Sequence, residues 1–242
     1  KHGNTYKMWF TGLNAGNYTI GYATADGPFP SIQDAIDAAA GGDTINVAAG
    51  TYVNDPYDST LSTPDSYRIT KQITLRGAHA GVDPEGSIDR GGETILVRTN
   101  GTPYSLYASN IVIDGFTFTS GEGSGGGRII VSGANVVVQN CIIRDVSGTD
   151  AHGMWIAAEA DNALIDRNTF SNTAWEAITC DGHAVISNNT IKDITDNKGI
   201  NLSASSTVTV TGNTISDTFY EGILCHGEAV ISFNDISSVY KG

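Results

Sequence analysis

The sequence predicts an all-β fold, a right-handed parallel β-helix (a solenoid) whose N-terminal end is covered by an amphipathic helix. Three observations support this prediction. A hexad of residues recurs at intervals of 21 to 27 residues along the chain. The repeated segments are short and rich in alternating β-branched residues, which indicates strands rather than helices. A segment with helical spacing, at about 31–40, precedes them.

The repeat is clearest when its hexads are aligned. They begin at Ile113, Val138, Ile165, Ile186, Val210 and Ile231. Repeats of this length stack as the turns of a solenoid, so equivalent residues in consecutive turns should lie about 4.8 Å apart. The leucine-rich repeat is excluded because its Leu-x-x-Leu-x-Leu signature is missing. Scattered residues therefore become columns on the surface of the coil.

One of these columns consists of asparagines at the fourth position of the hexad. Its members are Asn168, Asn189, Asn213 and Asn234, and Cys141 and Phe116 stand there in earlier turns. Asparagine tolerates the tight turn between strands, and its amide can bond to the asparagines above and below it. We interpret this column as architecture rather than chemistry.

The three cysteines are too few and too far apart for a disulfide framework. Cys180 and Cys225 fall in one inward-facing column with Ile156 and Leu202, two turns apart. That separation is roughly 10 Å from the strand spacing, which is beyond the reach of a disulfide. We therefore predict buried free thiols at these positions.

The helix that precedes the repeats lies in the segment PFPSIQDAIDAAAGGDTINVAAGTY (28–52). Its apolar residues between 32 and 39 have helical spacing, Ser31 can serve as the N-cap, and Gly41-Gly42 ends the pattern. A strand at 44–47 follows. An apolar helix face placed here would cover the open end of the coil.

Together with ITKQITLRGA (69–78), this segment resembles the opening of pectate-lyase-like β-helix proteins. The resemblance covers roughly residues 28–242 and implies a single β-helix domain with a cap helix. It also implies an extracellular or cell-surface protein. The superfamily contains lyases, hydrolases, esterases, epimerases, adhesins and phage spikes, so its fold does not select an activity.

Residues 1–27 differ from the rest and form a predicted β-hairpin leader. Two alternating runs, 5–11 and 18–24, flank a Gly/Asn turn. They resemble a blade hairpin of five-bladed propeller glycosidases, although one hairpin cannot build a propeller. The leader is either the tail of an upstream domain or a pair of strands recruited onto the β-helix, and we expect the second.

Charge and hydropathy restrict the partners. The 26 acidic and 13 basic residues give a net charge of −13. A polyanion is repelled by nucleic acid and by anionic membranes, so we expect no nucleic-acid partner. No apolar run approaches the length of a membrane span, so we expect no membrane insertion. The last turn has no evident cap, so we expect further domains or self-association at the C-terminal end.

Candidate functional residues follow the asparagine column, at the entry to the next strand. The column before the motifs Gly153-Met154, Ala177-Ile178, Gly199-Ile200 and Gly222-Ile223 contains His152, Glu176, Lys198 and Glu221. Trp155, Trp175 and Tyr220 lie beside it, and aromatic rings stack on the C–H faces of sugars. We expect a polysaccharide partner, with Trp155, Trp175, Lys198, Tyr220 and Glu221 binding it.

Two kinds of chemistry remain open for this surface. In lyase or epimerase chemistry on uronates, a base removes the sugar C5 proton while the carboxylate is neutralised. DAHG (150–153) with WEAITCD (175–181) resembles the Asp-x-His site of alginate C5-epimerases and related polyuronate lyases. That resemblance implies Asp150, His152 and Asp181 as the site, although Ser147 replaces the tyrosine expected upstream.

The other chemistry is hydrolysis by paired carboxylates, for which Glu176 and Asp181 come from one turn and Glu221 lies two turns from Glu176. No Asp-Asp motif of the polygalacturonases is present. Calcium is a candidate ligand of Asp150, Glu159, Asp161 or Asp181, without the usual loop signature.

The sequence thus predicts an extracellular, carbohydrate-active protein that binds, and in one hypothesis cleaves or epimerises, a uronate-containing polysaccharide. The competing hypothesis is a non-catalytic module of a cell-surface protein, either a stiff spacer or a glycan-binding unit. The clustered histidine, carboxylates and aromatics favour the enzyme. The incomplete site motif and the propeller-like leader favour the module.

Overall fold

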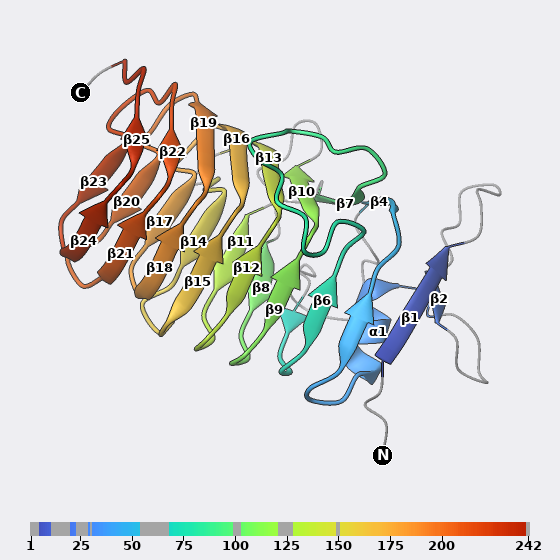
Figure 1. Ribbon diagram of the computed structural model, residues 1–242. Helices are drawn as coiled ribbons and strands as arrows, with labels where there is room; N and C mark the ends of the chain where they lie inside the picture. The colour runs from blue at the N-terminus through green and yellow to red at the C-terminus, as the bar shows by residue number, and fades with distance from the viewer. Residues whose placement is uncertain are drawn as a thin grey trace.

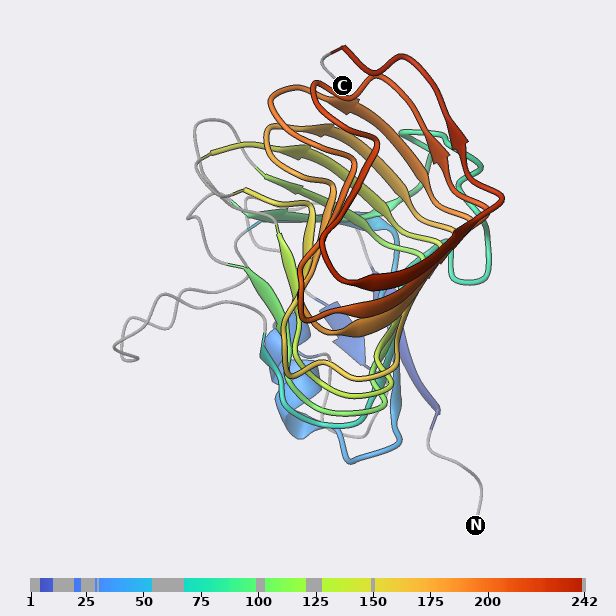
Figure 2. The same cartoon turned by 90° about the vertical axis from the view of Figure 1, so that its left-hand side faces the viewer.

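The computed structural model describes residues 5–10, 20–22, 29, 31–53, 68–98, 103–120, 128–148 and 151–240. Its chain winds into a right-handed coil in which each turn contributes one strand to each of three sheets (Figure 1). Figure 2 looks along the coil from its C-terminal end and shows the sheets around a common interior. The predicted parallel β-helix is confirmed.

Sheet 1 contains ten strands among the described residues. They are β1 (Thr5–Phe10), β2 (Ile20–Tyr22), β3 (Thr44–Asn46), β6 (Thr74–Arg76), β9 (Val112–Asp114), β12 (Val137–Gln139), β15 (Ala163–Asp166), β18 (His183–Ser187), β21 (Thr207–Thr211) and β24 (Glu228–Ser232).

Sheet 2 follows sheet 1 around each turn. Its strands are β4 (Gly50–Val53), β7 (Thr94–Arg98), β10 (Thr117–Ser120), β13 (Ile142–Val146), β16 (Thr169–Thr173), β19 (Thr190–Ile194), β22 (Thr214–Ile215) and β25 (Asp235–Ile236).

Sheet 3 completes the turn. Its strands are β5 (Arg68–Ile69), β8 (Tyr104–Leu106), β11 (Ile129–Val131), β14 (Met154–Ile156), β17 (Ile178–Cys180), β20 (Ile200–Leu202) and β23 (Ile223–Cys225).

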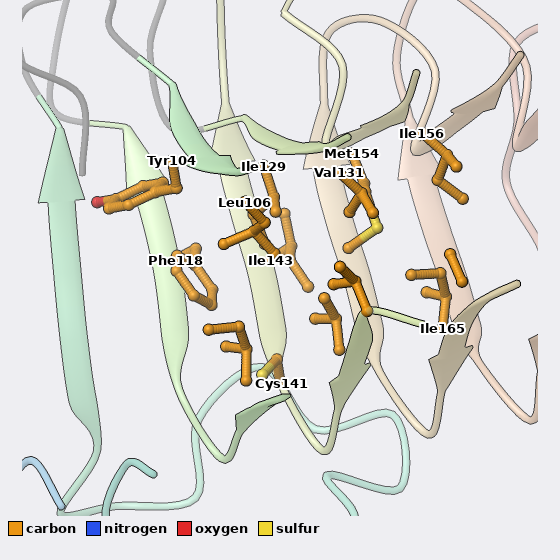
Figure 3. Close-up of a cluster of buried hydrophobic side chains, with 14 of the residues drawn as sticks. Tyr104, Leu106, Phe118, Ile129, Val131, Cys141, Ile143, Met154, Ile156 and Ile165 are labelled. Atoms are coloured by element: carbon orange, nitrogen blue, oxygen red, sulfur yellow. The ribbon is translucent and has the colours of Figure 1, made fainter. Parts of the chain in front are cut away.

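The core fills the inside of the coil because alternate side chains of each strand point inward. Phe118, Ile143 and Phe170 stack in this way in sheet 2, and all three are buried. Tyr104 of sheet 3 meets Phe118 edge to face, with ring centroids 5.0 Å apart. Figure 3 shows the neighbouring stack of sheet 3, in which Tyr104, Ile129 and Met154 follow one another in register. Each such side chain contributes about 1.5–3 kcal/mol through its burial.

The asparagine column forms a continuous ladder of hydrogen bonds. The Nδ2 of Asn168 donates to Oδ1 of Asn189 (3.1 Å), Asn189 donates likewise to Asn213 (3.0 Å), and Asn213 to Asn234 (2.9 Å). Each acceptor oxygen also receives the backbone N–H of the asparagine one turn earlier, at 2.9 Å. The same Nδ2 groups bond to carbonyls of the preceding turn, as at Ile165. The ladder therefore satisfies buried backbone groups at the corner between sheets 1 and 2.

The tight turn itself falls one residue before the position that the sequence analysis assigned to it. The left-handed backbone occurs at the residue that precedes each ladder position, such as Asn140 (φ 54°), Asn188 (φ 54°) and Gly212 (φ 68°). Glycine and asparagine tolerate this region best. The two roles therefore fall to different residues: one residue adopts the left-handed backbone of the turn, and the next residue makes the hydrogen bonds of the ladder.

The N-terminal helix α1 (Ile32–Ala38) is confirmed. Ser31 caps it by accepting the N–H of Asp34 at 3.0 Å. Ile32 and Ile36 are buried and line a small internal hollow together with Leu75 and Ile113 of sheet 1. The helix thus lies against the apolar interior at this end of the coil.

The leader strands β1 and β2 join sheet 1. They pair with each other in antiparallel fashion, and β1 pairs in parallel with β3, placing Thr5 opposite Thr44. This arrangement is the one expected of strands recruited onto the β-helix. The domain boundary at residue 27 stays a prediction.

The long connection between β6 and β7, residues 77–93, crosses the outer face of sheet 2 (Figure 1). Arg90 donates to the Asn140 carbonyl (2.9 Å), and Lys192 donates to the Gly86 carbonyl (2.8 Å). The outward-facing Thr117 and Thr169 of sheet 2 are at most 1% exposed. This part of sheet 2 is therefore not open to a large ligand.

A buried ion pair fixes the end of this connection. Arg90 Nε lies 2.7 Å from Glu93 Oε1, and Thr117 donates to Glu93 Oε2 at 3.0 Å. Burial by itself would raise the pKa of the Glu93 carboxyl, but the hydrogen bonds and charge of Arg90 and the Thr117 bond outweigh it and lower that pKa. The carboxylate therefore stays charged and paired.

The cysteine prediction is only partly correct. Register places Ile156, Cys180, Leu202 and Cys225 in one column, and the three cysteines are free. Cys141 and Cys180 are buried, and burial raises the pKa of each thiol to about 12. Cys225 is exposed instead, because no strand follows β23 in sheet 3 among the described residues.

We expect Asn189→Ala to destabilise the fold strongly. The change leaves buried groups of Asn168 and Ile165 unpaired, at a cost of about 1–3 kcal/mol each. Urea denaturation measures the loss. Asn162→Gly, at an exposed asparagine that bonds to Asn135 across one turn, is the matched control, because glycine keeps the left-handed backbone of this position (φ 53°), and it should change stability by less than about 0.5 kcal/mol. Equal effects of the two changes would contradict the structural role of the ladder.

Candidate functional site

The outer face of sheet 3 carries the candidate site. Each of its strands from β8 onward places the first and third residues inward and the second outward. Register aligns the outward residues from turn to turn. They are Ser105, Ile130, Trp155, Thr179, Asn201 and Leu224.

The predicted charged column lies at the entry to these strands. His152, Glu176, Lys198 and Glu221 occupy the same position in consecutive turns, so basic and acidic side chains alternate along the coil. A small residue follows each of them. A Cβ on Gly199 would lie 2.6 Å from the Gly222 carbonyl oxygen, so glycine is needed for this close approach.

His152 and Glu176 contact each other between consecutive turns. His152 Nδ1 lies 3.0 Å from Glu176 Oε2, and the His152 side chain is 18% exposed whereas that of Glu176 is 6% exposed. Among the described residues, Oε2 makes no regular hydrogen bond, so the attraction is chiefly electrostatic. A carboxylate held against one ring nitrogen is the arrangement that orients a histidine base.

Two polar neighbours support this pair, and the sequence analysis missed both. Thr179 Oγ1 lies 2.9 Å from His152 Nδ1. Asn201 Nδ2 donates to Glu176 Oε1 at 3.3 Å. Both belong to the outward column of sheet 3. The sequence did contain a signal for them, because Thr179 and Asn201 are polar residues at the centre of strand triplets whose other two residues are apolar.

The environment favours a charged Glu176. Burial alone would raise the pKa of its carboxyl, but the contact with His152, the backbone and the charges of His152 and Lys198 together lower that pKa. A carboxylate that stays ionised in a buried position keeps its attraction for the imidazole.

Trp155 and Asp181 form a second unit on the same face. The indole Nε1–H donates to Asp181 Oδ2 at 2.8 Å, and the Arg128 guanidinium carbon lies 5.9 Å from the indole centroid. Trp155 is therefore fixed between a carboxylate and a cation, with part of its ring exposed. Asp181, predicted as catalytic, has the tryptophan as its described side-chain partner.

Lys198 and the aromatics lie on the next turns. Lys198 Nζ lies 5.6 Å from the Tyr220 ring centroid and donates to Asn197 Oδ1 at 3.1 Å. Tyr220 is 38% exposed, and Trp175 is partly exposed. Glu221 is partly buried, and its Oε2 has no hydrogen-bond partner among the described residues. These groups offer a cation, a carboxylate and aromatic faces to a ligand.

The remaining predicted residues do not join this cluster. Asp150 lies outside the described residues. Glu159 and Asp161 are exposed. Within the described ranges, no three His, Cys, Asp or Glu side chains gather as a metal site.

A second hollow lies on the outer face of sheet 1, along β18, β21 and β24. The residues that line it include Asp161, His183, Val185, Thr209, Glu228 and Val230. Among the described residues, no side chain that lines this hollow belongs to an ion pair. The sheet 3 surface is thus the better candidate.

Comparison with known proteins agrees with the architecture. The family model described as "Right handed beta helix region" matches residues 88–237, which is more than half of the chain. No match was found among curated proteins or among solved structures. Within the described ranges, no helix has both the length and the apolar character needed to cross a bilayer.

We expect the contribution of Glu176 to stability to depend on pH. Its pKa is lowered in the fold, so the contribution is complete above the ordinary value of 4.5 and is lost as the pH falls through the folded pKa. The difference in unfolding free energy between the wild type and Glu176→Gln should therefore shrink as the pH falls below 4.5. Urea titrations across this range measure it.

The control is Glu159→Gln, an exposed glutamate in the same region. It should differ from the wild type by less than about 0.5 kcal/mol throughout. A Glu176→Gln difference that is constant with pH would rule out the charge of the Glu176 carboxylate as its source.

Proposed function

Because the chain belongs to the right-handed β-helix family, we propose that it is a carbohydrate-active protein that processes a uronate-containing polysaccharide on the outer face of sheet 3. Family membership supports a carbohydrate-active or a structural β-helix protein. The observation that carries the catalytic proposal is the 3.0 Å contact between His152 Nδ1 and Glu176 Oε2. We further propose that the protein acts outside the cell or at its surface.

His152 is the proposed base. An imidazole whose Nδ1 faces a carboxylate keeps the lone pair on Nε2, and Nε2 can then accept a proton. The base takes the C5 proton of a uronate unit. In elimination, the C5–H electrons form the C4–C5 double bond while the C4–O4 bond breaks, and the leaving oxygen takes up a proton. In epimerisation, C5 is instead reprotonated from the other face.

The surrounding groups suit the substrate. The developing negative charge at the C5 carboxylate needs a cation, and Lys198, one turn beyond Glu176, supplies one. Trp155 and Tyr220 provide faces for neighbouring sugar rings, and Trp155 is already fixed by Asp181. A chain of −13 net charge needs such a local cation to bind an acidic polymer.

We expect the protein to act on one member of a panel of polyuronates. The reaction is run in D₂O and followed by ultraviolet absorbance, which detects the unsaturated product, and by NMR, which detects deuterium at C5. His152→Ala should reduce either signal by about 10²–10⁴-fold, the usual contribution of a general base. His183→Ala, at an exposed histidine of sheet 1, should leave it unchanged.

Binding of a polymer without unsaturation or deuterium uptake would overturn the catalytic proposal and leave a glycan-binding module. The exposed aromatic and charged groups serve that function equally well. Equal losses in His152→Ala and His183→Ala would also count against His152 as the base.

A further inference from the structure

Side chains of sheet 3 reach back by one turn to contact the predicted site. Thr179 of β17 contacts His152, which precedes β14. Asn201 of β20 contacts Glu176, which precedes β17. The two contacts are equivalent because Thr179 and Asn201 are register partners. In these two turns the outward column therefore supports the charged column of the turn before it.

The surroundings of His152 Nδ1 decide where its proton lies. Thr179 Oγ1 is 2.9 Å from Nδ1, and Glu176 Oε2 is 3.0 Å from it. An ionised carboxylate can only accept hydrogen bonds, so a bare Nδ1 lone pair would be repelled by it. With a proton on Nδ1, the hydroxyl accepts the hydrogen bond and the carboxylate attracts the N–H dipole. Nε2 then carries the lone pair.

Asn201 fixes the carboxylate in turn. Its amide nitrogen faces Glu176 Oε1, since only a donor can face a carboxylate oxygen. With Oε1 held by Asn201, Oε2 is directed at the imidazole. Glu176 is 5% exposed, so little water could replace a lost amide. The orientation of the carboxylate therefore depends on this neighbour.

We infer that Thr179 and Asn201 are positioning residues, which hold His152 and Glu176 with the imidazole proton on Nδ1 and the basic nitrogen Nε2 available to substrate. Neither residue touches the reacting atoms, and the catalytic part of this inference rests on the proposed function. The tautomer itself does not depend on any substrate.

The next turn provides an internal comparison. Leu224 of β23 is the register partner of Asn201 and occupies the equivalent position relative to Lys198. An apolar side chain cannot hold the ammonium group by a hydrogen bond. Lys198 is directed instead at Asn197 and the Tyr220 ring. The polar residues thus stand where a histidine and a carboxylate need orientation, and Asn201→Leu reproduces a residue that the column already accepts.

The test measures the tautomer of His152 by ¹⁵N NMR of its imidazole, with the signal assigned through His152→Gln. In the wild type, the neutral ring should carry its proton on Nδ1. Thr179→Val and Asn201→Leu should each move a measurable fraction to the Nε2–H form. Thr179→Ser, which keeps the hydroxyl, should restore the wild-type signal. Urea midpoints establish that every variant is folded.

If a substrate is found, Thr179→Val and Asn201→Leu should lower kcat by about tenfold with KM little changed, as expected of groups that act through the base. A wild-type Nε2–H tautomer, or variants with an unchanged tautomer, would overturn the inference whatever the activity. A tautomer that shifts as expected in a protein without activity would support the positioning and refute only the proposed function.

Discussion

The structure depends on the stacking of one turn on the next in strict register. Many strands of the three sheets have only two or three residues, so each of these pairings makes few backbone bonds. The asparagine ladder adds a fixed point at one corner of the four turns from Asn168 to Asn234. Asn189 joins its neighbours on both sides through backbone and side-chain bonds. The group is buried, so a slipped turn would leave several polar atoms unpaired. In these turns the surface columns are aligned both by strand pairing and by this corner.

Register explains what the sequence could predict. The hexads aligned because each contains the same ladder and core positions, so the columns of Asn189, Cys180 and Glu176 followed from counting. Cap helix α1 was equally accessible, since Ser31 and the glycines mark its ends. The predicted burial of Cys225 was wrong because a residue of the coil is buried only when a turn packs against it on both sides. The turn residue was misplaced by one position because asparagine suits both the turn and the ladder, as Asn188 and Asn189 demonstrate.

The support of the site was harder to predict for a different reason. Columns describe which residues share a position, whereas the contacts of Thr179 and Asn201 run diagonally, from one column to another and from one turn to the one before. Their existence depends on side-chain rotamers and on the close approach permitted at Gly153 and Gly199. The position of residues 77–93 over sheet 2 could not be predicted from the sequence either, because these residues contact strands that come much later in the chain. Lys192, for example, donates to the Gly86 carbonyl.

These diagonal contacts make the site a property of consecutive turns rather than of any single repeat. Three successive turns contribute to the site. The first provides His152, the second provides Glu176 and Thr179, and the third provides Asn201. The coil supplies the rigidity, since each of these residues adjoins a strand paired on both sides. A repeat that carried a histidine alone would expose an imidazole whose proton no neighbouring group holds on Nδ1. The proposed chemistry therefore depends on residues that differ from one repeat to the next. The common backbone of the repeats is what places these residues in contact.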